Sequence, residues 1–94
     1  MAVPYKSTPQ FDEQSLPDAI RNAHSTKAGV WGLLVVDEGA ARLIFHKPRR
    51  EIAVAPDKLG LIPPQAVHHV ETFGPVRLHV EFYRENPLDR ADQS

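Results

Sequence analysis

A double proline followed by two adjacent histidines, in the stretch LIPPQAVHHVE that spans residues 61–71, constrains this chain more than any other sequence feature. Pro63 and Pro64 each fix φ near −65° and lack a backbone donor, so strand pairing is expected to stop there. The chain should re-enter a strand at about Val67. Because successive side chains of a strand face opposite sides of the sheet, only one of His68 and His69 can point into a given cavity.

Short apolar runs separated by turn residues predict an all-β fold. Residues 30–36 (VWGLLVV) form the strongest strand, and the turn signal DEG at 37–39 predicts that residues 41–45 return as its antiparallel hairpin partner. A further short strand is expected at 51–55, and Phe73-Gly74-Pro75 should close another hairpin. Residues 17–23 could form no more than one short helical turn, which is too short to hold itself.

The last strand, at residues 76–83 (VRLHVEFY), alternates cleanly between apolar and polar side chains. Its apolar face carries Leu78, Val80 and Phe82, and its other face carries Arg77, His79, Glu81 and Tyr83. Strands at this short, regular spacing predict an antiparallel sandwich or small barrel, and a barrel would also remove exposed edges. We expect an extended arm at residues 1–10, a barrel domain at 11–86 and a flexible tail at 87–94.

Composition excludes several classes of protein. The 94 residues suffice for one small domain, and 11 basic against 12 acidic residues give a formal net charge of −1, so nucleic acid is a poor first candidate for a partner. No apolar run approaches the ~20 residues that a membrane helix needs, and no signal peptide is apparent, so the cytoplasm is the expected location. Without cysteine, any metal must be held by His, Asp or Glu.

The candidate ligands are His24, His68, His79 and Glu81, which come from three separate segments, as a pocket inside a β-barrel requires. His79 and Glu81 share one face of their strand, an arrangement in which imidazole and carboxylate can converge on a divalent ion. The alternative is that this face is simply the solvated side of a strand whose other side is the core.

Other residues favour more ordinary roles. His69 has the opposite parity to His68 and is expected at the rim or in solvent, and His46 is expected in a solvated loop, so neither counts as a ligand. Trp31 is predicted to anchor the core or a subunit interface in a homodimer. Lys27 is a candidate anion contact, although a lysine in a polar linker is usually solvated.

Three blocks of the sequence resemble the TehB/YeaR-like family of small tellurite-resistance-associated domains: HSTKAGVWG at 24–32, PPQAVHHVE at 63–71 and GPVRLHVEFY at 74–83. The resemblance covers most of the chain, from about Tyr5 to Arg84. That family is cupin-like, which implies a small double-stranded β-helix, or jelly-roll barrel, with antiparallel strands.

Cupins commonly hold a divalent metal through histidines and a carboxylate inside the barrel. The resemblance matches His68 to the histidine of the second cupin motif and brings His24 close to the start of the first. Here the chain departs from the pattern, since Lys27 follows His24 and no glutamate precedes Glu38. Glu81 matches an acidic position of the final block. The implied ligands to zinc, nickel or iron are therefore His24, His68 and Glu81. The resemblance implies that His79 varies, so His79 is a candidate additional ligand only through the strand face that it shares with Glu81.

The resemblance implies a role in tellurite or related oxyanion stress but defines no substrate and no catalytic residue. Two hypotheses follow. The domain is either a metal-dependent enzyme, in which the ion acts on a small anionic ligand beside Lys27, or a non-catalytic metal or small-ligand binding or sensing module.

Overall fold

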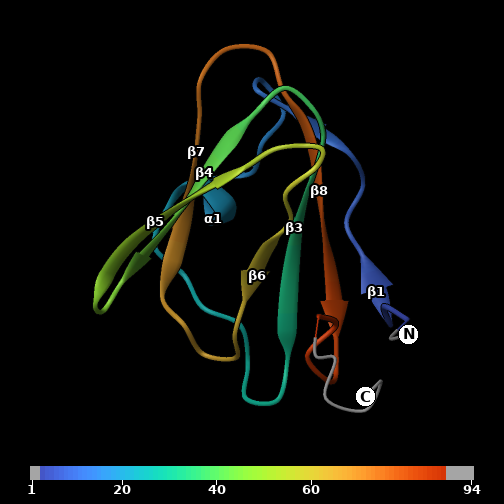
Figure 1. Ribbon diagram of the computed structural model, residues 1–94, viewed down its shortest axis with the longest axis vertical. Helices are drawn as coiled ribbons and strands as arrows, with labels where there is room; N and C mark the ends of the chain where they lie inside the picture. Colours follow the sequence, from blue (N-terminus) through green and yellow to red (C-terminus); the bar gives the residue numbers. More distant parts are fainter. Residues whose placement is uncertain (1–2, 89–94) are drawn as a thin grey trace.

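The computed structural model describes residues 3–88, which form eight strands and one short helix (Figure 1). In chain order the elements are β1 (Lys6–Ser7), β2 (Phe11–Asp12), α1 (Asp18–Arg21), β3 (Trp31–Glu38), β4 (Ala41–His46), β5 (Arg49–Val54), β6 (Gly60–Ile62), β7 (His68–Thr72) and β8 (Arg77–Tyr83). Every pair of neighbouring strands is antiparallel. The predicted all-β, antiparallel class with almost no helix is confirmed.

The strands form two sheets that face each other. The first has the order β1-β8-β3-β6, with β2 also paired to β8, and the second has the order β5-β4-β7. Apolar side chains from both sheets form the core between them, led by Leu34 and Leu78 from the first sheet and Leu43, Val54 and Val70 from the second. The alternation predicted for β8 holds, because Leu78 and Val80 are buried in this core.

Two connections that the sequence predicts as hairpins instead cross from one sheet to the other. β3 is followed by β4, and β7 by β8, but the members of each pair lie in different sheets. The chain bends at Gly39, where φ is +85°, and at Gly74, although Asp37 and Glu38 of the first predicted turn still belong to β3. A Cβ on Gly39 would collide with the Pro75 carbonyl oxygen, so the two crossover loops pack against each other at the upper end in Figure 1. Both hairpin predictions are wrong because β8, not β4, occupies the place beside β3.

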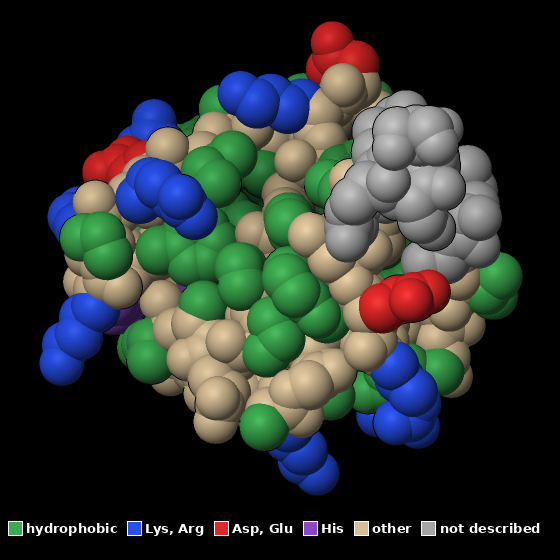
Figure 2. All heavy atoms as spheres, turned by 60° about the horizontal axis from the view of Figure 1, so that its bottom comes forward, with side chains coloured by type: hydrophobic (Ala, Val, Ile, Leu, Met, Phe, Trp, Pro, Cys, Tyr) green, Lys and Arg blue, Asp and Glu red, His purple; other side chains and the backbone are tan. Residues whose placement is uncertain are grey.

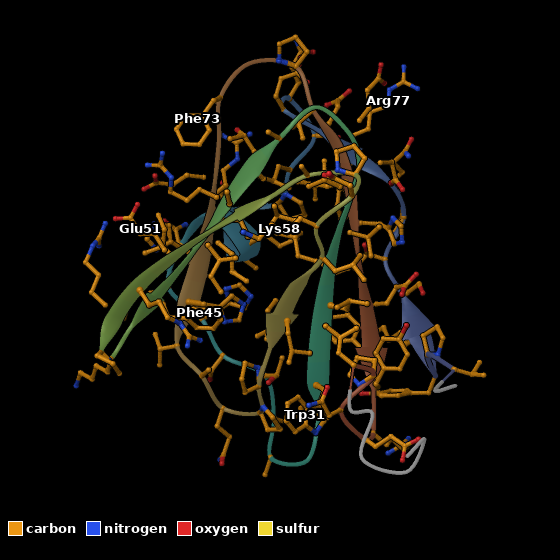
Figure 3. The ribbon with its side chains drawn as sticks, viewed as in Figure 1. Trp31, Phe45, Glu51, Lys58, Phe73 and Arg77 are labelled. Carbon is orange, nitrogen blue, oxygen red and sulfur yellow. The ribbon has the colours of Figure 1, made fainter. Side chains whose placement is uncertain are left out.

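The closed barrel is also not observed. Within residues 3–88 no strand of one sheet pairs with a strand of the other, so the sheets remain open. The exposed edge at β5 carries Arg49, Arg50 and Glu51, and such charges discourage pairing with another chain. Figure 3 shows Glu51 at this outer edge, away from β3 and β8.

The N-terminal segment is part of the first sheet. Lys6 of β1 lies opposite Phe82, and Phe11 of β2 lies opposite Leu78, so the predicted arm runs along β8. The helix α1 follows it beside the second sheet (Figure 1). The tail predicted at 87–94 lies outside the described residues from position 89 onwards. No helix among residues 3–88 is long and apolar enough to span a membrane.

Candidate functional site

A cavity of about 580 Å³ lies between the sheets, within the range of about 300–1,000 Å³ typical of small-molecule sites. Both sheets, α1 and the N-terminal segment line it, and most of the lining is apolar, including Phe11, Ile20, Leu34, Ile62, Val80 and Phe82. Figure 2 brings the lower end of the molecule forward and shows apolar side chains across its middle, with lysines and arginines around the margin. The cavity is therefore suited to an organic ligand.

Two histidines, His24 and His68, stand side by side in the cavity wall. The segment containing His24 pairs with the free edge of β7: the His24 N–H donates to the His68 carbonyl at 3.0 Å, and the His68 N–H donates to the His24 carbonyl at 2.9 Å. Directly opposed residues of an antiparallel bridge project to the same side. The ring centroids accordingly lie 4.3 Å apart.

In each ring of this pair, one nitrogen is hydrogen-bonded to a backbone carbonyl. His24 Nδ1 lies 3.0 Å from the Asn22 carbonyl oxygen, and His68 Nδ1 lies 2.7 Å from that of Ala66. A carbonyl can only accept a hydrogen bond, so both Nδ1 atoms carry the proton in the neutral rings. Nε2 then holds a lone pair, and the described residues provide no hydrogen bond to it. The pair offers two basic nitrogens to a ligand.

His68 is the buried member, with 2% of its surface exposed. Burial lowers the pKa of His68, and this outweighs the Ala66 carbonyl, which favours the charged form. The parity predicted for residues 66–70 is thus confirmed: His68 and Val70 point inward, and His69 points outward.

The polar lining is basic or neutral. Lys6 and Lys27 border the cavity and are exposed, and Thr8, Ser25 and Thr26 add hydroxyl groups. None of the residues that line the cavity is acidic. The Thr26 hydroxyl oxygen accepts a bond from the Gln65 N–H at 3.1 Å, which fastens the His24 segment to the turn that follows the double proline. Lys27 lies where an anion contact was predicted, and its role stays a prediction.

Glu81 and His79 lie on the other face of the first sheet. Val80 and Phe82 line the cavity, so the alternating neighbours of β8 point away from it. There His79 Nδ1 lies 2.9 Å from Asp37 Oδ2, and His79 Nε2 lies 3.1 Å from Glu81 Oε2. The Tyr83 hydroxyl donates to Glu81 Oε1 at 2.6 Å. This face holds an internal hydrogen-bonded chain and is more than a solvated surface.

The pKa values along this chain follow its geometry. The Tyr83 hydrogen bond is the main cause that lowers the pKa of Glu81, while burial and then the bond to Glu81 raise the pKa of Tyr83 to about 12. Burial opposes the charged form of His79, but Asp37 and Glu81 outweigh it and raise the pKa of His79. The contacts of His79 with two carboxylates therefore favour its charged form.

These positions bear directly on the expected metal ligands. The structure brings His24 and His68 together but not Glu81 or His79, and within residues 3–88 no group of three or more His, Asp or Glu side chains could hold one ion. A structural zinc site has four ligands, and a catalytic site has three from the protein. The cavity supplies two, so the predicted set of three does not fit a single site here, and metal binding itself stays a prediction.

His46 and His69 differ from expectation. His46 ends strand β4 rather than lying in a loop, and both side chains are half-buried on the outer face of the second sheet. His46 Nε2 lies 2.7 Å from His69 Nδ1. No sequence pattern indicates this pair, because contact between β4 and β7 depends on strand order.

Lys6 and Phe11 are among the cavity residues that the sequence did not indicate. They lie in the N-terminal segment, which has no periodic pattern. Only the pairing of β1 and β2 with β8 brings them to the site.

Comparisons with known proteins agree with this architecture. The model of the family described as TehB-like domain matches residues 6–80. The crystal structure of TehB from Haemophilus influenzae superimposes with a TM-score of 0.78 at 28% identity, over 86% of this chain and 30% of that chain. A protein from Escherichia coli strain K12 superimposes with a TM-score of 0.78 at 22% identity, over 87% of this chain and 89% of that chain, a likeness that concerns the fold alone.

The chain spans less than a third of the length of the Haemophilus protein, since it covers 30% of it. A search of curated proteins found no match.

Proposed function

This chain belongs to the TehB-like domain family, and on that premise we propose that it binds a small organic acid with an apolar body in the cavity between its sheets. The observation that carries the proposal is the buried His68 beside His24 in a mostly apolar cavity whose lining includes no carboxylate.

The apolar lining selects the body of the ligand. Side chains such as Leu34, Ile62 and Phe82 favour a hydrocarbon or aromatic group, because contact with them removes apolar surface from water at about 25 cal/mol per Å². A bare inorganic oxyanion such as tellurite would lose its water and gain few polar contacts in return. An organic acid satisfies both parts of the site.

The histidine pair selects the head group. With Nδ1 donating to the backbone, Nε2 of each neutral ring is an acceptor, so the matching ligand atom is an O–H donor. A weak acid supplies that hydrogen. If the proton moves from the acid to Nε2, the result is an imidazolium–carboxylate pair, and the total number of protons is unchanged. Lys6 and Lys27 favour the negative charge in either case.

The test is calorimetric titration with three ligands of one chain length: octanoate, 1-octanol and octylammonium. Octanoate should bind at least about tenfold more tightly than octylammonium, because the head-group charge changes sign in a basic site. Imidazole NMR signals of His24 and His68 should shift with octanoate. Equal affinity for all three ligands, or no saturable binding, would refute the proposal.

A double variant, His24→Gln with His68→Gln, should weaken octanoate binding by at least about tenfold through loss of both basic nitrogens. The matched control, His46→Gln with His69→Gln, changes two histidines on the outer face and should leave octanoate affinity unchanged. A loss in the control equal to that in the cavity variant would contradict the assignment of the site.

Divalent metal binding by His24 and His68 is the second candidate. It is supported by the hydrogen bonds from each Nδ1 to a backbone carbonyl, which is how metal-binding histidines are usually oriented. With two protein nitrogens, water or the ligand's oxygens would fill the remaining positions. Elemental analysis of untagged protein would detect resident zinc, nickel or iron, and the same double variant should lose it.

Two further expectations complete the proposal. The crossovers between the facing sheets support a cupin-like jelly roll.

A homodimer would use the outer face of the first sheet, where Trp31 and Val35 are half-buried (Figure 3 shows Trp31 at the lower end of β3). Light scattering at micromolar concentration tests for the dimer, and a stable monomer would exclude it.

A further inference from the structure

The outer face of the second sheet carries a histidine pair that the cavity does not use. His46 ends β4 and His69 lies in β7, two neighbouring antiparallel strands. Their rings meet nearly at right angles, at 87°, with centroids 4.9 Å apart and with His46 Nε2 2.7 Å from His69 Nδ1. His69 Nε2 lies 3.1 Å from Glu71 Oε2. The three side chains form one continuous chain of hydrogen bonds.

The protons of this chain can be assigned from its acceptors. An ionised Glu71 can only accept, so His69 Nε2 carries a proton and His69 Nδ1 holds a lone pair. His46 Nε2 must then supply the single hydrogen that lies between the two rings. When neutral His46 takes its other tautomer, with the proton moved to Nδ1, two lone pairs face each other, and a bound cation relieves their repulsion.

We propose that His46 Nε2 and His69 Nδ1 bind one divalent transition-metal ion on the outer face of the second sheet. Two nitrogens at about 2.0–2.1 Å from one ion stand roughly 3 Å apart, so only a small opening of the pair is needed. Glu71 completes the carboxylate–histidine–metal arrangement that fixes the ring orientation and strengthens the ligand.

The proposed site leaves coordination positions for water, and its imidazole nitrogens favour certain transition metals. No third ligand is present among residues 3–88, so water fills the remaining positions. Imidazole nitrogen suits copper, nickel and zinc, and copper(II) should bind most tightly of the three. This inference is independent of the cavity, because His69 and His68 lie on opposite faces of β7.

The test is competitive titration of untagged protein with copper(II) and zinc, with a chelator of known affinity. His46→Gln and His69→Gln should each weaken binding at least about tenfold, as loss of one ligand of two requires. His68→Gln is the matched control on the same strand and should leave this affinity within a factor of about two. The copper EPR spectrum should show coupling to two imidazole nitrogens in the parent and to one in each outer variant.

Three results would overturn the proposal: no binding at millimolar zinc or copper, unchanged affinity in both outer variants, or loss confined to the His24 and His68 variants. The last would assign the metal to the cavity. Thermal unfolding of each variant checks that the fold persists, and if His69→Gln fails to fold, His46→Gln at the strand end decides the question.

Discussion

The two histidine pairs share strand β7 but lie in opposite environments. The inner pair, His24 and His68, sits in an apolar cavity with lysines at its border and no lining carboxylate. In the outer pair, His46 and His69, the Nε2 atom of His69 contacts the carboxylate of Glu71. Under the two proposals, adjacent residues of one strand serve a carboxylic acid on one side and a metal cation on the other.

The two pairs differ in the group that accepts a hydrogen bond from the ring nitrogen: a backbone carbonyl in the inner pair and a carboxylate in the outer pair. In the inner pair both Nδ1 atoms donate to neutral carbonyls, and the free Nε2 atoms belong to side chains that line the cavity. In the outer pair a carboxylate accepts from His69, which makes the facing nitrogen more basic. The hydrogen-bond partner of an imidazole, more than its presence, decides which chemistry it offers.

The largest difference should appear in stability. His68→Ala removes a buried ring and leaves the Ala66 carbonyl unpaired, so the free energy of unfolding should fall by about 2–4 kcal/mol. His69→Ala removes a side chain with 18% exposure whose partners can turn to water, so about 1 kcal/mol is expected. Urea denaturation of both variants beside the parent measures this.

A common m-value is the control, because a changed slope would mean that the native or denatured state had changed. Equal losses for the two variants, or a larger loss for His69→Ala, would mean that the strand parity does not govern the two pairs.

That parity is the part of the site that could be predicted from sequence. The double proline fixes where β7 begins, and the period of two then separates His68 from His69 without any tertiary information. The same period put Leu78 and Val80 in the core. Strand periodicity predicts which side chains share a face, because this depends only on the strand itself.

Strand order could not be predicted in this way. The chain bends at Gly39 and Gly74, within the turns predicted at 37–39 and 73–75, yet neither turn closes a hairpin, because the choice of partner depends on how both sheets pack. The expected ligand Glu81 fails to reach the histidines for a related reason: its face of β8 is opposite to that of Val80, which lines the cavity. Nothing local to β8 tells which of its faces meets His68.

The second prediction tests the carboxylate of the outer pair. Glu71→Gln keeps the shape of the side chain but removes its charge, so metal affinity at the outer pair should fall about tenfold, the lower end for such supporting residues. Glu51→Gln is the control: it lies on the same face but pairs with Arg42 and Arg49. Chelator competition measures both, and equal losses would mean that only the general charge of the face matters.

The third prediction uses pH to distinguish an inward histidine from an outward one. Burial lowers the pKa of His68 below 6.5, so the unfolded chain takes up its proton first, and the stabilisation due to neutral His68 is present above about pH 6.5 and lost as the pH falls towards the lowered pKa. His79 has the opposite sign: its raised pKa gives a stabilisation that is present below about pH 6.5 and lost as the pH rises through that pKa.

The measurement is the unfolding free energy of the parent minus that of His68→Gln, and likewise of His79→Gln, between about pH 5 and pH 8. The first difference should increase with pH until it levels off, and the second should decrease. Two slopes of the same sign would contradict the contrast between the buried ring and the ring held between Asp37 and Glu81.

The smallest effect is expected at the border of the cavity. Lys27 is exposed, so its attraction to a bound carboxylate acts largely through water, and Lys27→Ser should weaken octanoate binding only about two- to fivefold. Raising the salt concentration should shrink this difference, since the Debye length falls to about 3 Å at 1 M. Lys47→Ser changes another exposed lysine, next to His46 in the sequence, and should leave octanoate affinity unaltered. If both lysine variants weaken octanoate alike at low salt, the net charge of the protein attracts the anion; if neither does, the hydrogen-bonding nitrogens of His24 and His68 select the acid without help from Lys27.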